Sequence, residues 1–226
     1  MAASTISSFA RGMVIAAGAA LFFFSEAASG QAVRTTPGAA RPAGSARATL
    51  RIKDMSKPGK QSLVSSPDID GKVKSPGHIN RGQNWKWAML EVKYETSPDW
   101  IDEITFTFYV LSKAKDPKTG VEQYHLFQTA VSYLDIEKGE HHAAAMLPPN
   151  AVKRYGEPIA YGVDITLDGE SVETLSSGFG NAKEPWWNSP GFNKLGDRLV
   201  RHSGYLKDRS QTPFGATYID EYEAVR

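Results

Sequence analysis

From residue 48 onward, apolar and polar positions alternate with a period of two. The clearest case is residues 104–110, ITFTFYV, in which four apolar side chains alternate with Thr and Tyr. Successive side chains of a strand point to opposite faces of its sheet. This segment is therefore predicted to be a strand with one face on a core and the other in water.

Two hairpins are expected along the chain. Residues 124–136, YHLFQTAVSYLDI, return as the partner of the first strand after a charged turn that contains Pro117 and Gly120. Residues 159–167 and 171–175 flank Asp168-Gly169, a favoured hairpin turn pair. Residues 50–52 form a short opening strand. Residues 85–94, WKWAMLEVKY, are apolar on both sides, which predicts a central strand.

Short strands separated by Gly and Pro turns favour an all-β fold, an antiparallel β-sandwich over residues 48–180. No stretch before residue 190 has the pattern of a long amphipathic helix, and residues 139–158 are read as a strand edge and a crossover. Residues 181–226 form a C-terminal extension with a short helix around residues 195–206. Its apolar side chains predict that it packs on the sandwich; they are Leu195, Leu199, Val200, Leu206 and Phe214.

The N-terminus has the pattern of an export signal. Arg11 precedes an apolar run at residues 12–24, and small residues follow, with Ala28 and Gly30 at the positions that a signal peptidase reads. A membrane-spanning helix needs about 20 apolar residues, which makes a retained anchor the weaker alternative. Residues 1–30 are thus predicted to be a signal peptide and residues 31–47 a flexible Pro/Gly/Ala linker. The expected location is the periplasm or the outer cell surface.

Composition narrows the classes of function. The 26 basic and 25 acidic residues nearly cancel, so no nucleic-acid partner is expected. Hydrophobic residues make up 41% of the chain, which suits a packed core. Contact with a membrane is expected only during export or through a partner. There is no cysteine, which excludes disulfides, a lipoprotein anchor and a cysteine nucleophile.

Motifs for catalysis or metal binding are weak. The sequence has no G-x-S-x-G elbow, no P-loop and no H-E-x-x-H helix. Adjacent His141 and His142 would point to opposite faces of a strand. Residues 68–71, DIDG, resemble the start of a calcium loop, but Lys72 and Lys74 stand where ligands belong. The prediction is no enzyme, no cofactor and no metal.

Aromatic and basic residues of the extension are the candidate interaction residues. They are Trp186, Trp187, Arg198, Arg201 and Phe214. Tryptophans and arginines are enriched at the centres of protein interfaces. For Trp186 and Trp187, anchoring of the extension to the sandwich is the favoured interpretation, and a partner's contact is the alternative. In a competing hypothesis, two exposed tryptophans stack on a glycan. The pair would be Trp85 and Trp87, or Trp186 and Trp187.

The pattern of Trp186-Trp187, residues 208–214 (DRSQTPF) and residues 218–222 (YIDEY) resembles small exported proteins of Verrucomicrobia-type bacteria that are encoded with type IV pilus-like assembly genes. The resemblance implies an immunoglobulin-like sandwich at the cell envelope without enzymatic activity. The predicted function is a protein-interaction module whose partners are envelope or pilus-assembly proteins. The alternative is a carbohydrate-binding β-sandwich module.

Overall fold

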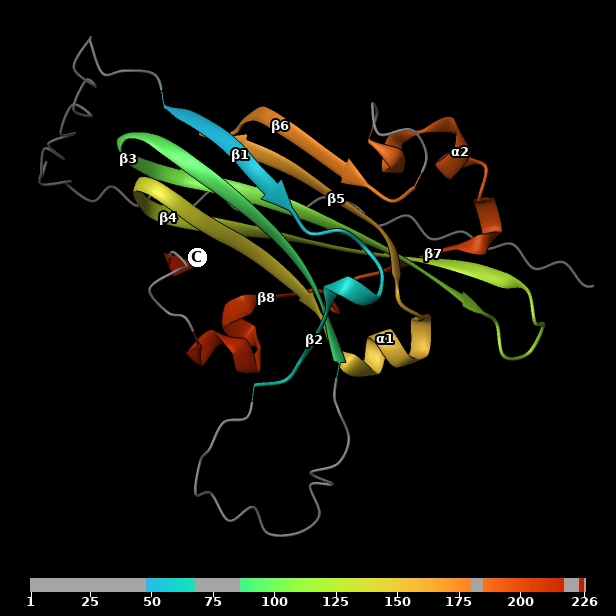
Figure 1. The fold of residues 1–226 in the computed structure, drawn as a ribbon. Coiled ribbons are helices and arrows are strands. Elements are labelled where there is room, and N and C mark those ends of the chain that lie inside the picture. The colour runs from blue at the N-terminus through green and yellow to red at the C-terminus, as the bar shows by residue number, and fades with distance from the viewer. Residues whose placement is uncertain (1–47, 68–85, 180–184, 218–223, 226) are drawn as a thin grey trace, which may run out of the picture. The chain divides into compact units, whose positions relative to one another are not determined.

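Two very long strands organise the fold. The computed structural model describes residues 48–67, 86–179, 185–217 and 224–225 (Figure 1), all within the unit Ser45–Arg226. Within these residues, β3 (Lys86–Lys115) and β4 (Glu122–Leu147) pair antiparallel along almost their whole length. The predicted signal peptide, the linker, the DIDG turn and Trp85 lie outside the described residues.

The described strands form one sheet in the order β6-β5-β3-β4-β7. The further strands pair with the central two: β1 and β2 with β3, and β8 and β9 with β4. Their bounds are β1 Thr49–Met55, β2 Leu63–Ser65, β5 Pro158–Leu167, β6 Glu170–Ser177, β7 Leu199–His202, β8 Lys207–Asp208 and β9 Ala224–Val225.

The long hairpin bends where its register shifts. Thr96 pairs with Gly139 and Trp100 with Glu137, so residues 97–99 of β3 face a single residue of β4. Extra residues on one strand bend it and increase its twist, and a proline in a strand is tolerated at such a bulge. As a result, the first half of β3 packs against its second half, with the rings of Tyr94 and Phe106 5.1 Å apart.

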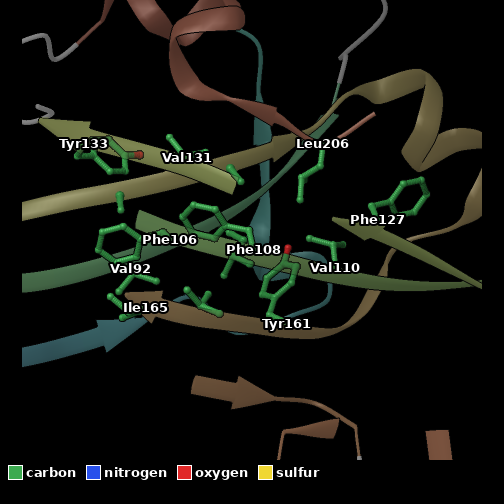
Figure 2. Close-up of a cluster of buried hydrophobic side chains, with 14 of the residues drawn as sticks. Val92, Phe106, Phe108, Val110, Phe127, Val131, Tyr133, Tyr161, Ile165 and Leu206 are labelled. Carbon is green, nitrogen blue, oxygen red and sulfur yellow. The ribbon is translucent and has the colours of Figure 1, made fainter. Parts of the chain in front are cut away.

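The bend gives a sandwich whose two layers belong to one continuous sheet. Figure 2 shows the core between them, where Val92 from the first half of β3 faces Phe106 and Phe108 from the second half. Phe127, Val131 and Tyr133 of β4 complete the core, together with side chains of β5. The predicted all-β, antiparallel sandwich is confirmed, as are the pairing of residues 104–110 with β4 and the Asp168-Gly169 hairpin.

Two details of the prediction were wrong, and a third was incomplete. Residues 85–94 and 104–110 were expected as separate strands, but β3 runs through both because the bulge bends the strand without ending it. Residues 139–158 are a strand and a crossover as predicted, because β4 continues to Leu147 and the chain then crosses to β5, but the crossover also contains helix α1 (Pro149–Tyr155), which was not expected. The expected helix at residues 195–206 is replaced by a 3-10 turn, η3 (Gly196–Arg198), and β7, because this apolar segment pairs with β4.

The chain after β6 covers the outer faces of the sheet. The 3-10 turn η2 (Trp186–Asn188) and helix α2 (Pro190–Asn193) lie over Leu111, Leu126 and Ala160. Two further 3-10 turns, η4 (Arg209–Gln211) and η5 (Pro213–Ala216), follow β8, and η1 (Lys60–Ser62) precedes β2. No helix among the described residues is long and apolar enough to cross a membrane.

Candidate functional site

The tryptophan pair predicted as a contact is buried. Trp186 is 1% exposed, and its indole N–H donates to the carbonyl oxygen of Tyr161 at 2.8 Å. Trp187 is 9% exposed and stacks on Tyr109, with the ring centroids 4.5 Å apart. The two indoles meet edge to face at 84°, so they form no flat platform for a sugar ring. Both side chains fasten the extension to the sheet.

The other predicted residues do not gather into one surface. Phe214 is half-buried and meets the ring of Trp87 edge to face, at a centroid distance of 5.9 Å. Arg198 and Arg201 are exposed, the former in η3 and the latter in β7. Of the five candidate residues, Arg201 alone lies beside a stretch of the sheet that lacks a described pairing strand on one side.

That region is an edge of β4. On the side of β4 that faces away from β3, β7 pairs with residues 124–127 and β9 pairs with residues 133–134. No described strand pairs with residues 128–132 on that side, and we call this stretch the β4 edge. Its side chains alternate: Val131 points into the core, while Gln128 and Ala130 are exposed. The open backbone groups of such an edge are ready to pair with another strand.

A hollow of about 510 Å³ lies at the β4 edge where β7 ends. We call it the edge hollow. One side comes from β4 and the other from the end of β7 and the residue after it. The lining residues are Leu126, Gln128, Thr129, Ala130, Arg201, His202 and Ser203.

Arg201 gives the edge hollow its charge. Its guanidinium group lies over the ring of Phe192, 6.0 Å from the centroid. No carboxylate of the described residues forms an ion pair with it. None of the described residues that line the edge hollow carries a carboxylate. The edge hollow therefore presents a cation to any ligand that enters it.

His202 belongs to an aromatic cluster that fixes β7 to β4. Its Nε2 lies 3.0 Å from Nδ1 of His125, and its ring stacks on Phe127 and contacts Tyr155. Burial, and then the cationic Arg154, lower the pKa of His202. Burial, and then His202 and Arg154, lower the pKa of His125. Both rings are thereby kept neutral near pH 7, which lets one nitrogen donate and the other accept.

The two other histidines in the described part of the chain have structural partners. His141 Nε2 lies 2.7 Å from the carbonyl oxygen of Glu137, which can only accept, so this nitrogen carries the hydrogen. His142 lies on the other face of β4, with Nδ1 3.1 Å from Oε1 of Glu91. Among the described residues, no three His, Asp or Glu side chains are grouped so that they could hold a metal ion.

Sequence reasoning did not find the β4 edge. Residues 124–136 predicted a strand, but the period-two pattern carries no information about which neighbour pairs with each part of it. One signal was present in the sequence. Residues 128–132, QTAVS, contain neither a charge nor a proline, the two residue classes that usually protect an edge.

Comparison with known proteins supports the fold. A protein-family model matches residues 53–226. The chain belongs to this family. No curated protein matches it. A crystal structure of a protein from Akkermansia muciniphila, a Verrucomicrobium, is 24% identical with a TM-score of 0.60, and the alignment covers 80% of this chain and 95% of that one. That likeness shows a shared fold. The resemblance drawn from the tail pattern, including the pilus gene context, stays a prediction.

Proposed function

We propose that this chain is an exported, non-catalytic protein-interaction module of the bacterial cell envelope. In the finer form of the proposal, it serves as an accessory of a type IV pilus-like or secretion apparatus. The observation that carries the proposal is the β4 edge, where five residues have no described strand on one side. Addition of a strand to such an edge is a common mode of protein recognition, because main-chain hydrogen bonds supply the affinity.

Two further observations favour a binding role. The predicted export signal at residues 1–30 would bring the chain to the envelope, where assembly factors act. The edge hollow adds side-chain pockets next to the open backbone, and such pockets supply specificity in strand addition. The glycan alternative has less support, because Trp186 and Trp187 are buried and meet at a right angle rather than in a plane.

Site-specific photo-crosslinking in the producing bacterium tests the proposal. A photoreactive amino acid replaces Ala130 at the β4 edge, and a matched variant carries it at Val172, an exposed residue of the edge strand β6. We expect one envelope protein to crosslink at residue 130 and not at residue 172. Mass spectrometry then identifies it, and pilus or secretion components are the expected class.

Equal crosslinking at both positions, or no crosslinked protein at residue 130, would contradict the proposal. Recovery of glycan without a protein partner would move the interpretation to the carbohydrate-binding alternative. Both variants change exposed side chains, so the melting temperature of each is expected to match that of the unmodified chain, and its measurement completes the control.

A further inference from the structure

We infer that the β4 edge receives an extended, acidic segment of a partner protein. This inference rests on the proposed function and adds the chemistry of the partner. The unpaired stretch is five residues long, which at about 3.3 Å per residue spans roughly 17 Å. A peptide of about five residues in extended conformation fills it.

The neighbouring strands show that this side of β4 accepts added strands. β7 pairs with it in parallel and β9 in antiparallel orientation, each over a short stretch. The pairing partners at the two boundaries are His202, opposite Phe127, and Val225, opposite Tyr133. An incoming segment would therefore lie between two existing strands, in line with both, and extend the same ladder.

The β4 edge lacks the protection that other strands of this sheet carry. Natural proteins keep edges from pairing with charged side chains, prolines and bulges. β6 carries Glu170 and Glu173, and β1 carries Arg51 and Lys53. Residues 128–132 are QTAVS, without a charge or a proline. Of these three strand segments, in β6, β1 and β4, the β4 edge is therefore the one suited to pairing with a partner.

Charge complementarity decides the kind of partner. Arg201 lines the edge hollow without an ion-pair partner among the described residues, and its position over Phe192 restricts the guanidinium group. His202 is kept neutral and so adds no competing charge near pH 7. An Arg with an open fork of donors binds a carboxylate in two parallel hydrogen bonds. The segment is therefore expected to carry Asp or Glu where it passes β7.

Selection from a phage-displayed library of random short peptides on the immobilised full protein tests the inference. We expect the selected peptides to combine β-branched residues with Asp or Glu. In fluorescence anisotropy with a selected peptide, Arg201→Gln should weaken binding about fivefold, the worth of an exposed ion pair, and Arg201→Glu about tenfold. Arg198→Glu is the matched control, because Arg198 is exposed but lies outside the lining of the edge hollow. It should change affinity less than about twofold.

Two further measurements locate the peptide. Methylation of alternate backbone nitrogens in the selected peptide should abolish binding, because a methylated nitrogen cannot donate to the ladder. Ala130→Glu should weaken binding and Ala130→Lys should not, since the two variants differ in the sign of the charge at one exposed position. Circular dichroism of each variant confirms that the fold is retained.

Several outcomes would overturn the inference. Selection of basic or uncharged peptides, or equal effects of Arg201→Glu and Arg198→Glu, would reject the acidic partner while leaving the proposed interaction module standing. Binding that tolerates backbone methylation would reject strand pairing. Failure to select any peptide would reject the inference, and so would a dimer in sedimentation that no peptide dissociates, since a second copy would then cover the β4 edge. The proposed function itself fails if crosslinking at residue 130 finds no partner, or if residues 130 and 172 crosslink equally.

Discussion

Gly162 lies directly opposite Tyr109 in the ladder between β3 and β5, and the indole of Trp187 occupies the space that a side chain at residue 162 would need. A Cβ atom built there would lie 2.0 Å from Cζ3 of Trp187. The indole stacks on the Tyr109 ring at an interplanar angle of 16°. A glycine in a strand often marks such a close approach, and here the cross-strand aromatic ring supports the residue that fills the gap.

Gly162→Ala is expected to destabilise the protein by about 2 kcal/mol, because the new methyl group overlaps a buried ring whose position is fixed on two sides. Chemical denaturation measures the change in the free energy of unfolding. In the background of Trp187→Ala, the same Gly162→Ala change should cost less than about 0.5 kcal/mol, since the space is then open. Equal costs in both backgrounds would show that strain in β5 itself, rather than contact with Trp187, causes the loss.

This pair also shows what the sequence could and could not predict. Tyr109 and Gly162 lie in segments whose period-two pattern predicted strands, and those strands form. The alternation of apolar and polar residues carries no information about their contact with Trp187, which is about 25 residues away from Gly162 along the chain. Trp187 was a candidate for a partner's contact because exposed and buried indoles look the same in sequence. Burial is decided by tertiary packing.

The candidate site follows the same logic. Arg201 could be named from sequence because it belongs to a cluster of basic residues in the tail, at Lys194, Arg198, Arg201, Lys207 and Arg209. Its importance depends on β7 ending at His202, opposite Phe127, and on β9 ending at Val225, opposite Tyr133, which leaves residues 128–132 between them. Such stopping points arise from pairing between segments more than 70 residues apart. Local periodicity carries no information about them, which is why the tail segment 195–206 was expected to be helical.

The bend of the long hairpin depends on Thr96. The hydroxyl of Thr96 donates to the carbonyl oxygen of Glu137 at 2.7 Å. The Thr96 hydroxyl oxygen also accepts from the backbone N–H of Gly139 at 3.2 Å. Thr96 is 2% exposed, so no solvent replaces these partners. Register shifts leave backbone groups without ladder partners, and a buried unpaired group is costly. One hydroxyl thus serves two backbone groups where β4 turns over the core.

Thr96→Val is therefore expected to lower the free energy of unfolding by about 2 kcal/mol, because it keeps the shape, leaves the backbone N–H of Gly139 without its hydroxyl acceptor, and leaves the Glu137 carbonyl with the His141 ring as its remaining donor. Thr96→Ser keeps the hydroxyl and should cost less than about 1 kcal/mol. Urea titration of the three proteins checks both values. If the two variants lost equal stability, the methyl group of Thr96 rather than its hydroxyl would be the important part, and the explanation of the bend would be wrong.

The pairing of His125 with His202 makes stability depend on pH. Two neutral rings share one hydrogen bond at 3.0 Å, whereas two protonated rings would have only donors facing each other. Burial and the nearby Arg154 already lower the pKa of each ring below its ordinary value near 6.5. The unfolded chain, with ordinary pKa values, binds these protons first as the pH falls. The histidine contribution to stability is thus fully present above about pH 6.5 and is lost below it.

We expect the urea midpoint to fall as the pH is lowered from 7 to 5, a window above that in which carboxylates such as Glu95 and Glu140 titrate. His202→Phe should remove much of this dependence, because a phenyl ring can keep the stacking on Phe127 without binding a proton. His142→Phe is the matched control on the other face of β4, where it should leave the slope attributed to the buried pair in place. A midpoint that is constant between pH 7 and 5, or a slope that persists in His202→Phe, would show that the buried pair does not control stability. Loss of the slope in His202→Phe alone would identify the contact between β7 and β4 as the acid-sensitive element beside the β4 edge.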